Sequence, residues 1–355
     1  MGRRRLAATA TAGLVTAVLA LGGCGSDSGS GTGGGDPTYI TLITKDPDNH
    51  FWTSMAEGAK AAAKSANAEI TVAAGRDQSD ADGQIRAIED AISRGDDAIL
   101  IANNGPAVND AIKRARDAGL YVLALDTPTD PVNLVDGTFA SDNFEAGELI
   151  GKWAAGALEG KKATVALLDL FADKVVSVDY QRDQGFLSGL GVDVKDTKKN
   201  GDEAKTGKYS GGDYQIVCNQ ATNGAEDGGR SAMENCLSLD KNINVVFAAN
   251  ETSGVGAAQA LKAAGNTEAL VVSIDGSCRG VKAVTDGEFG AVAQQYPSEM
   301  GRFGVEAVVK HLADGANPTP SQGQDFVNTG VRLVTDRQVA GIAGISSAEG
   351  AKTCW

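Results

Sequence analysis

The strongest constraint in this sequence is a regular alternation of short apolar runs with longer alanine-rich segments, which begins at residue 39. The short runs are rich in β-branched residues, as expected for strands that are covered on both faces of a parallel sheet. In the longer segments, apolar side chains recur at the helical period, as at Ile85, Ile88 and Ile92. Repeated strand–helix units predict an α/β fold with right-handed crossovers and doubly wound sheets.

The pattern predicts where each strand and helix lies. The expected strands cover residues 39–44, 70–73, 98–101, 121–125, 164–168, 245–248, 270–274 and 291–294. The expected helices cover residues 51–66, 80–94, 107–118, 144–158, 179–190, 231–237, 253–264, 281–286 and 298–313.

Composition and charge exclude several classes of protein. The formal net charge of −14 argues against a protein that binds nucleic-acid phosphates or lies flat on an anionic bilayer. With 42% apolar and 22% charged residues, the chain is an ordinary globular one, long enough for about two domains. Only two histidines are present, so a histidine-built metal centre is not expected.

The beginning of the sequence, as far as Cys24, has the features of a secretory leader. Arg3, Arg4 and Arg5 precede an apolar stretch too short to span a bilayer, which ends in Leu21-Gly22-Gly23-Cys24. This tetrad resembles the bacterial lipobox, in which the cysteine becomes the lipidated first residue, so Cys24 is the expected lipidation site. The alternative is an ordinary cleaved signal. Residues 25–37 then form a Gly/Ser-rich tether with a reach of roughly 20 Å.

Four further cysteines remain after Cys24. They are Cys218, Cys236, Cys278 and Cys354, an even number in an oxidising compartment. Four cysteines allow three pairings, and sequence alone does not choose among them. We expect Cys218–Cys236 and Cys278–Cys354, because the second pair would fasten a loose C-terminal segment. The alternative is four free structural thiols.

Polar residues follow most of the expected strands. In open α/β sheets the ligand binds outside the carboxyl ends of the strands, so these residues predict a hydrogen-bonding rim suited to neutral hydroxyls. For each residue alone, the alternative role is a helix N-cap. The rim comprises Asp48-Asn49, Asn103-Asn104, Asp126, Asn250-Glu251, Asp275 and Gln295.

One enzyme hypothesis comes from residues 276–280. The run Gly276-Ser277-Cys278-Arg279-Gly280 has the form of a nucleophile elbow between a strand and a helix. With Asp286 and His311 it would make an exported cysteine hydrolase. An exported thiol is expected to be oxidised, however, and nothing in the sequence orients His311.

Two further motifs are near-matches only. Gly254 and Gly256 follow a strand but lack the third glycine of a dinucleotide fingerprint, and close helix packing explains them equally well. Asp80 and Glu89 fall at calcium-loop positions, but Gln78 stands where that loop needs Asp. Acidic residues in the first turn of a helix are the simpler interpretation. We therefore expect no metal and no cofactor.

Several motifs occur in an order that resembles one known family. The chain from residue 39 onward resembles the type I periplasmic sugar-binding proteins of ABC importers, ribose/galactose group, and most of all the fructose-type subgroup. The motifs are ITKDPDNHFWTSMAEGAKAAAKSA, ALDTP, FASDNFEAGELIG, QRDQGF, VVFAANETSGVGAAQAL, VVSIDGSCRGVKAVTDG, AVAQQYPSEMG, AMENCLSLDKNINVV and AKTCW.

The resemblance implies two Rossmann-like lobes joined by three crossover segments. The N-terminal lobe would comprise residues 38–141 and 296–331, and the C-terminal lobe residues 142–295 and 332–355. Phe51 and Trp52 would stack on a sugar ring, and Ser141 would lie at a crossing. Hydrogen bonds to the sugar would come from Asn49, Asn103 or Asn104, Asp126, Arg182, Asn250, Asp275 and Gln295.

The same resemblance implies a function. The chain would be a non-catalytic receptor that captures a monosaccharide between its lobes and presents it to the transmembrane subunits of an ABC permease. It would act as a monomer, held by a lipid at the outer face of the bacterial cell membrane. The alternatives are the cysteine hydrolase above and a sugar-sensing lobe for signalling. A transcriptional repressor is disfavoured, because a leader stands where a DNA-binding headpiece would be.

Overall fold

Two sheets of mostly parallel strands carry the fold. The computed structural model describes residues 36–172 and 175–355, and residues 37–355 form one compact unit. The leader, Cys24 and most of the tether lie outside the described residues. No helix in the described part of the chain is long and apolar enough to cross a membrane.

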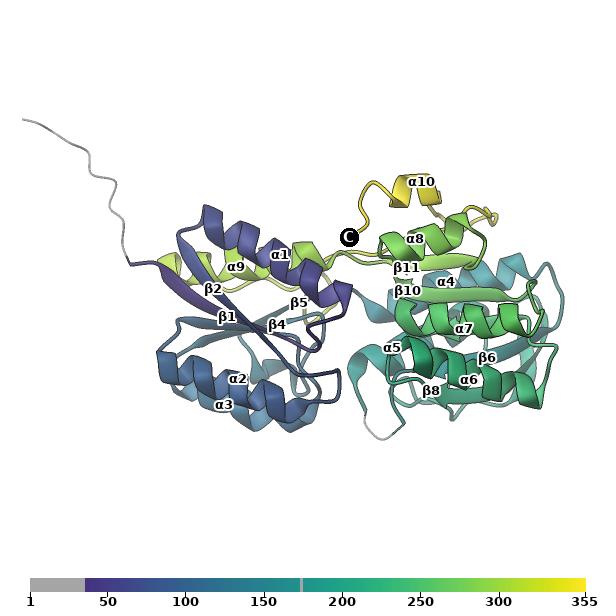
Figure 1. Cartoon of the computed structure of the whole chain (residues 1–355), viewed down its shortest axis with the longest axis horizontal. Helices are drawn as coiled ribbons and strands as arrows, with labels where there is room; N and C mark the ends of the chain where they lie inside the picture. Colours follow the sequence, from purple (N-terminus) through teal and green to yellow (C-terminus); the bar gives the residue numbers. More distant parts are fainter. Residues whose placement is uncertain (1–35, 173–174) are drawn as a thin grey trace, which may run out of the picture. The chain divides into compact units, whose positions relative to one another are not determined.

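The first sheet has six strands, and all of its neighbouring strands are parallel. Helices α1 (His50–Ser65) and α9 (Pro297–Asp314) cover one face, and α2 (Ala81–Arg94) and α3 (Asn109–Asp117) cover the other (Figure 1). In order across the sheet, the strands are β12 (Val327–Asn328), β5 (Gly137–Ala140), β4 (Tyr121–Leu125), β3 (Ala98–Ile101), β1 (Thr38–Thr44) and β2 (Ala68–Ala74).

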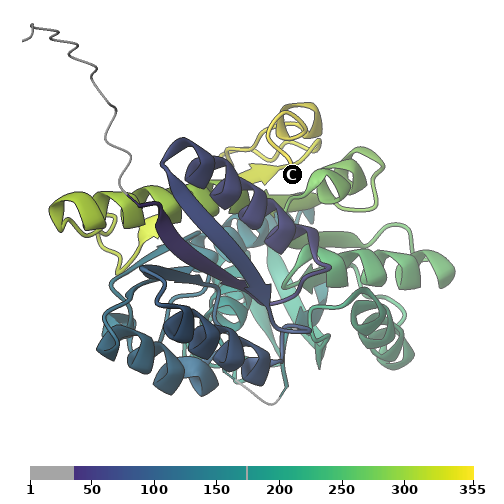
Figure 2. The same ribbon diagram turned by 60° about the vertical axis from the view of Figure 1, so that its left-hand side comes forward.

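Helices α1 and α9 pack closely although they lie far apart in the sequence. Figure 2 shows α1 (purple) and α9 (yellow-green) over the same face of the six-stranded sheet. Gly58 makes the close approach possible, because a Cβ at this position would lie 2.0 Å from the carbonyl oxygen of Ser298. A late segment of the chain thus helps to hold α1, whose first turn contributes to the site described below.

The second sheet has seven strands, and only its two edge strands are antiparallel to their neighbours. Helices α4 (Asn143–Ala157) and α5 (Ser177–Leu190) cover one face, and α6 (Glu226–Leu239), α7 (Glu251–Ala263) and α8 (Cys278–Thr285) the other. In order, the strands are β13 (Arg332–Val334), β11 (Ala291–Gln294), β10 (Leu270–Asp275), β9 (Val245–Ala248), β6 (Ala163–Asp169), β8 (Gly212–Ala221) and β7 (Thr206–Tyr209). The short helices η1 (Pro106–Val108), η2 (Val132–Leu134) and α10 (Ser347–Gly350) complete the described secondary structure.

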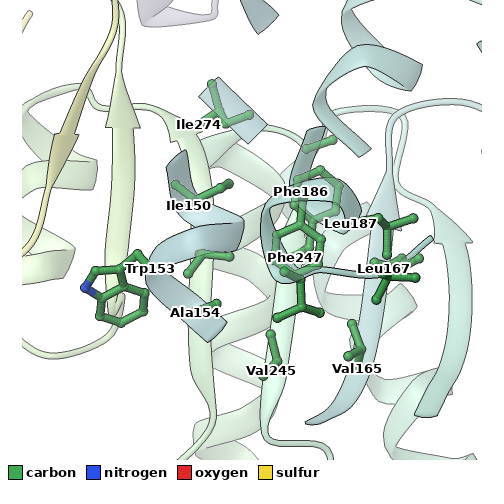
Figure 3. Close-up of a cluster of buried hydrophobic side chains, with 14 of the residues drawn as sticks. Ile150, Trp153, Ala154, Val165, Leu167, Phe186, Leu187, Val245, Phe247 and Ile274 are labelled. Atoms are coloured by element: carbon green, nitrogen blue, oxygen red, sulfur yellow. The ribbon is translucent and has the colours of Figure 1, made fainter. Parts of the chain in front are cut away.

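Each face of each sheet has its own apolar core. Figure 3 shows the core under α4 and α5, in which Phe186 and Phe247 stack with their ring centroids 4.8 Å apart. Trp153 lies at the edge of this core, fully buried, and its Nε1 donates to the carbonyl of Arg337. Apolar packing on both faces makes each sheet a rigid support for the loops at its ends.

The chain passes between the two sheets three times. It crosses after β5, after β11 and between β12 and β13. Two of the crossings are joined, because Ser141 Oγ donates to the carbonyl of Gly330 (3.2 Å) and the backbone N–H of Asp142 donates to Asn328 Oδ1 (3.3 Å).

The sequence-based elements agree with the structure in type and differ at several places. All eight expected strands form, but β5, β7, β8, β12 and β13 were not expected. Strand β8 lies inside the sheet between β6 and the edge strand β7, yet its buried residues alternate with half-exposed ones, so it lacks the continuous apolar run that we sought. The helix expected over 231–237 is longer, and begins at Glu226.

Both expected disulfides are present. Cys218 pairs with Cys236, and Cys278 pairs with Cys354. The first joins β8 to α6 within one core, and the second joins the start of α8 to the last residues of the sequence.

A cluster of buried carboxyl groups lies between β6, α5 and the loop before β7. It contains Asp169, Asp183 and Glu203, which are 3%, 0% and 8% exposed. Each has one carboxyl oxygen that makes no hydrogen bond within the described residues. Burial raises the pKa of Asp183 to about 8, and the nearby charge of Glu203 acts in the same direction. Burial also raises the pKa of Asp169 well above its usual value, as do the charges of Asp183 and Asp179.

This cluster predicts that stability falls as the pH rises. In the unfolded chain an Asp has a pKa of about 3.9, so between about pH 4 and pH 8 the folded state binds more protons than the unfolded state. Asp183→Asn needs no proton, so its melting temperature should fall less than that of the wild type between pH 5 and pH 8. Thermal unfolding followed by circular dichroism measures this, with Asp193→Asn, at an exposed position, as the control. Equal slopes for the wild type and Asp183→Asn would contradict the prediction.

Candidate functional site

Residues from both sheets line one small inner cavity. Strand β1 leads to Lys45, the loop before α1 and its first turn supply Asn49, Phe51 and Trp52, and β4 leads to Asp126. The seven-stranded sheet supplies Arg182 from α5 and Asp275 from the end of β10. The complete lining is Lys45, Asn49, Phe51, Trp52, Gln78, Asp126, Leu170, Val178, Arg182, Asn250 and Asp275.

The residues from the six-stranded sheet form a bonded group around Asp126. Lys45 Nζ lies 3.7 Å from Asp126 Oδ2 and donates to Thr127 Oγ1 at 2.7 Å. Thr127 Oγ1 in turn donates to Asp126 Oδ2 at 2.7 Å. Lys45 Nζ also lies 5.4 Å from the centre of the Trp52 ring, within the range of a cation–π interaction. The cation compensates for the burial of a carboxylate whose side chain is 5% exposed.

The residues from the seven-stranded sheet form a matching group around Asp275. Arg182 Nη1 lies 3.5 Å from Asp275 Oδ1, and Gln295 Nε2 donates to the same oxygen at 2.7 Å. The guanidinium is held in place by the side chain of Asn143 and the carbonyl of Ala249. Burial raises the pKa of Asp275 to about 6, although the positive charge of Arg182 acts in the opposite direction.

Both carboxylates sit in a backbone conformation that L-residues rarely adopt. Asp126 has φ = 63° and Asp275 has φ = 122°. Such values cost of order 1–3 kcal/mol and persist where the surrounding structure imposes them, often at ligand sites. Each aspartate directly ends or follows a strand, so the strained backbone turns a carboxylate toward the space beyond the sheet.

Two polar atoms near the cavity lack partners among residues 36–172 and 175–355. Trp52 is 5% exposed, and its Nε1 has no acceptor. Gln295 is fully buried, and its Oε1 has no donor. An unpaired buried polar group costs about 1–3 kcal/mol, so such groups call for a polar ligand or an ordered water.

The inner cavity is too small for a ligand of sugar size in this arrangement. Its volume is about 30 Å³. This is room for a water molecule, whereas sites for small molecules measure about 300–1,000 Å³. An adjoining outer cavity of about 380 Å³ shares Asn49, Gln78 and Asp275 with it, and Glu251, Arg279 and Trp355 are among its other lining residues. A ligand can therefore reach the inner residues only if the walls move apart.

Most of the predicted site residues converge on the inner cavity. They are Asn49, Phe51, Trp52, Asp126, Arg182, Asn250 and Asp275. Gln295 lies behind this set and donates a hydrogen bond to Asp275. Phe51 and Trp52 meet edge to face, with ring centroids 4.7 Å apart, and belong to the core under α1 as well as to the cavity wall.

Some predicted residues take other positions. Asn103 closes a loop, because its Nδ2 donates to the carbonyl of Thr127 and its Oδ1 accepts from the N–H of Gly105. Asn104 is buried, and its side chain has no partner among the described residues; neither asparagine lines the cavity. Ser141 lies at the crossings. Asn250 lines the cavity and also caps α7, where its Oδ1 accepts from the N–H of Ser253.

Sequence reasoning missed four residues of the lining: Lys45, Gln78, Leu170 and Val178. Lys45 follows the carboxyl end of a strand and is polar, so the rule that found Asp126 could have found it; Leu170 has the same place after β6 but is apolar, so that rule passes over it. Gln78 was considered only as a departure from a calcium loop.

The residues behind the catalytic, metal and dinucleotide alternatives have other roles in the described part of the chain. Cys278 is in a disulfide and offers no thiol, while His311 stacks on Tyr121 at a centroid distance of 3.8 Å on the six-stranded sheet. In the described residues, no group of three or more His, Cys, Asp or Glu side chains is arranged to hold a metal. Asp80 caps α2 instead: hydrogen bonds from the backbone of Arg76 and Gly83 lower its pKa to about 2. Gly256 permits the close packing of α7 on α6.

Known proteins share both sequence and fold with this chain. The ribose import binding protein of Escherichia coli is 27% identical over 275 residues, which cover 77% of this chain and 84% of that protein. The D-apiose import binding protein of Actinobacillus succinogenes is 31% identical over 243 residues, covering 68% and 71%. The galactofuranose-binding protein of Escherichia coli is 30% identical over 261 residues, covering 70% and 74%.

Solved structures show the same fold. A solute binding protein from Actinobacillus succinogenes with bound D-allose has a TM-score of 0.71 at 24% identity, covering 84% of this chain and 97% of that one. A galactofuranose binding protein has a TM-score of 0.72 at 24% identity, covering 89% and 98%. Residues 40–317 match the periplasmic binding protein domain. This chain therefore belongs to the periplasmic binding protein family and is a homologue of the import binding proteins of ABC transporters, which are not enzymes.

Proposed function

We propose that this protein binds a monosaccharide between its two sheets and delivers it to an ABC importer. The observation that carries the proposal is the convergence of two carboxylates, two cations and two aromatic rings, supplied by both sheets, on one cavity. Carboxylates accept strong hydrogen bonds from hydroxyls, Arg and Lys donate to them, and the C–H faces of a sugar dock on aromatic rings. The curated relatives that bind ribose, D-apiose and galactofuranose support the same ligand class.

The two sheets act as two lobes in this proposal. Residues 38–141 and 296–331 form one lobe, and residues 142–295 and 332–355 form the other, with hinges at the three crossings. The sugar enters while the lobes are apart and stabilises the closed arrangement by contacts to both, which is a shift in population. The inner cavity, at about 30 Å³, is too small for a sugar, which supports the proposal that the lobes move apart.

The proposed location follows from the beginning of the sequence. Cys24 carries a lipid at the outer face of the bacterial cell membrane, and residues 25–37 connect this anchor to the folded part. The protein works there as a monomer and presents its sugar to the transmembrane subunits of the importer.

A thermal-shift screen tests the ligand class. D-Fructose, D-ribose, D-xylose, D-galactose, D-glucose and myo-inositol are each added in excess, and one of them is expected to raise the melting temperature by several degrees. Binding at 100 times Kd contributes about 2.7 kcal/mol to the stability of the folded state. Asp126→Asn should abolish the shift, whereas Asp117→Asn, an exposed aspartate on α3, should retain it. No shift with any of these sugars would contradict a monosaccharide ligand.

The raised pKa of Asp275 predicts that sugar affinity depends on pH. Sugar hydroxyls stabilise the carboxylate form, so binding should release a proton and strengthen as the pH rises through about 6. Titration calorimetry of the wild type from pH 5 to pH 8 should show Kd falling with pH. Asp275→Asn should bind more weakly and with a flatter profile, and Asp183→Asn, which does not line the cavity, should keep the wild-type profile. A flat wild-type profile would show that Asp275 does not bind the sugar as a carboxylate.

A further inference from the structure

Trp355 is anchored on the seven-stranded sheet. The neighbouring Cys354 is joined by a disulfide to Cys278, the first residue of α8. The backbone N–H of Cys278 also donates to the carbonyl oxygen of Trp355 at 3.0 Å. A covalent and a hydrogen-bonded link thus fix the position of Trp355 relative to α8, the helix that begins three residues after Asp275 at the end of β10.

The indole of Trp355 reaches the other sheet. Its ring meets Phe51 edge to face at a centroid distance of 5.4 Å, and it packs against the core under α1. Its Nε1 donates to the carbonyl of Gln295 at 2.9 Å, at the crossing between β11 and α9. The Gln295 side chain in turn bonds Asp275. Trp355 therefore contacts Phe51, which lines the inner cavity. It is also linked through Gln295 to Asp275, which lines the cavity from the other sheet.

Trp355 is also half-buried and lines the outer cavity, next to Asn49 and Asp275. It is not among the residues that line the inner cavity. This position lets it act on the site by holding Phe51 and Gln295 in place.

We infer that Trp355 is a positioning residue of the ligand site and that the Cys278–Cys354 disulfide holds it there. The inference rests on the proposed sugar-binding function. Because the indole is attached to one sheet and packs on α1 of the other, its contact with Phe51 is made only when the sheets are close. It therefore favours the closed arrangement and reduces the ordering that a sugar must impose on binding. Loss of the disulfide leaves only hydrogen bonds and packing to hold the residue and weakens this preorganisation.

Affinity measurements on the full chain test the inference. Kd is measured by calorimetry with whichever sugar of the panel above binds the wild type. Trp355→Ala should raise Kd about tenfold, which corresponds to about 1.4 kcal/mol. Trp355→Phe keeps an aromatic edge but loses the Nε1 donor, so it should recover part of the affinity. The double variant Cys278→Ser/Cys354→Ser should also weaken binding, by a factor no larger than that of Trp355→Ala.

The second disulfide supplies the matched control. Cys218→Ser/Cys236→Ser removes a disulfide within the core under α6, away from the lining of both cavities, and should keep the wild-type Kd. Wild-type affinity in Trp355→Ala, or in Cys278→Ser/Cys354→Ser, overturns the inference. Equal weakening by both cysteine pairs overturns it too, since the effect would then be one of general stability.

A readout without sugar separates this inference from the proposed function. Hydrogen exchange of residues 50–56 should accelerate in ligand-free Trp355→Ala, while exchange in α4 should not change. If the wild type binds no sugar of the panel, the proposed function fails. In that case hydrogen exchange of the ligand-free variant tests whether Trp355 holds the start of α1. Unchanged hydrogen exchange at residues 50–56 overturns the inference.

Discussion

Burying a carboxylate is costly unless a cation and hydrogen-bond donors compensate for the lost water, and this protein buries two of them at the ends of two separate sheets. Lys45 compensates Asp126, and Arg182 compensates Asp275. Each pair is closed within its own sheet, so each can persist when the sheets separate. Two polar atoms beside these pairs have no hydrogen-bond partner in the described part of the chain: the Nε1 of Trp52 and the Oε1 of Gln295. A ligand hydroxyl in the inner cavity can accept from the N–H of Trp52, which is one reason why we connect this site to sugar binding.

The topology serves this arrangement. Parallel strands place all their carboxyl ends along one edge, so a single sheet can aim several loops at one ligand. Two such sheets surround a ligand from both sides, and the chain achieves this by crossing between them three times. Two of the three crossings are bonded to one another through Ser141 and Gly330, which ties two of the segments where a hinge is proposed. Helix α9 packs on α1, and Trp355, whose neighbour Cys354 is disulfide-bonded to α8, contacts Phe51.

Much of this could be predicted from the sequence, because the strong signals are local. Continuous apolar runs identified most of the interior strands, although the interior strand β5 was missed, and the polar residue after a strand identified Asp126 and Asp275. Strand β8 was missed because half-exposed residues separate its buried ones: Tyr214 and Ile216 join the core under α4 and α5, and Cys218 joins the core under α6 and α7. Lys45 was not predicted as a site residue because a lysine after a strand usually belongs to the solvated surface. Its burial depends on the ion pair with Asp126, which is distant in the sequence. Asn103 satisfied the strand-end rule, but its side chain is used to close a loop.

The most direct test of the central claim is a crystal structure of the protein with its bound sugar. We expect one sugar ring between the two sheets, with hydroxyls within hydrogen-bonding distance of both Asp126 and Asp275 and an oxygen accepting from Trp52 Nε1. The inner cavity should be enlarged to hold the ring, with Lys45 and Arg182 still beside their carboxylates. A sugar bound elsewhere, or one that contacts the residues of only one sheet, would contradict the account.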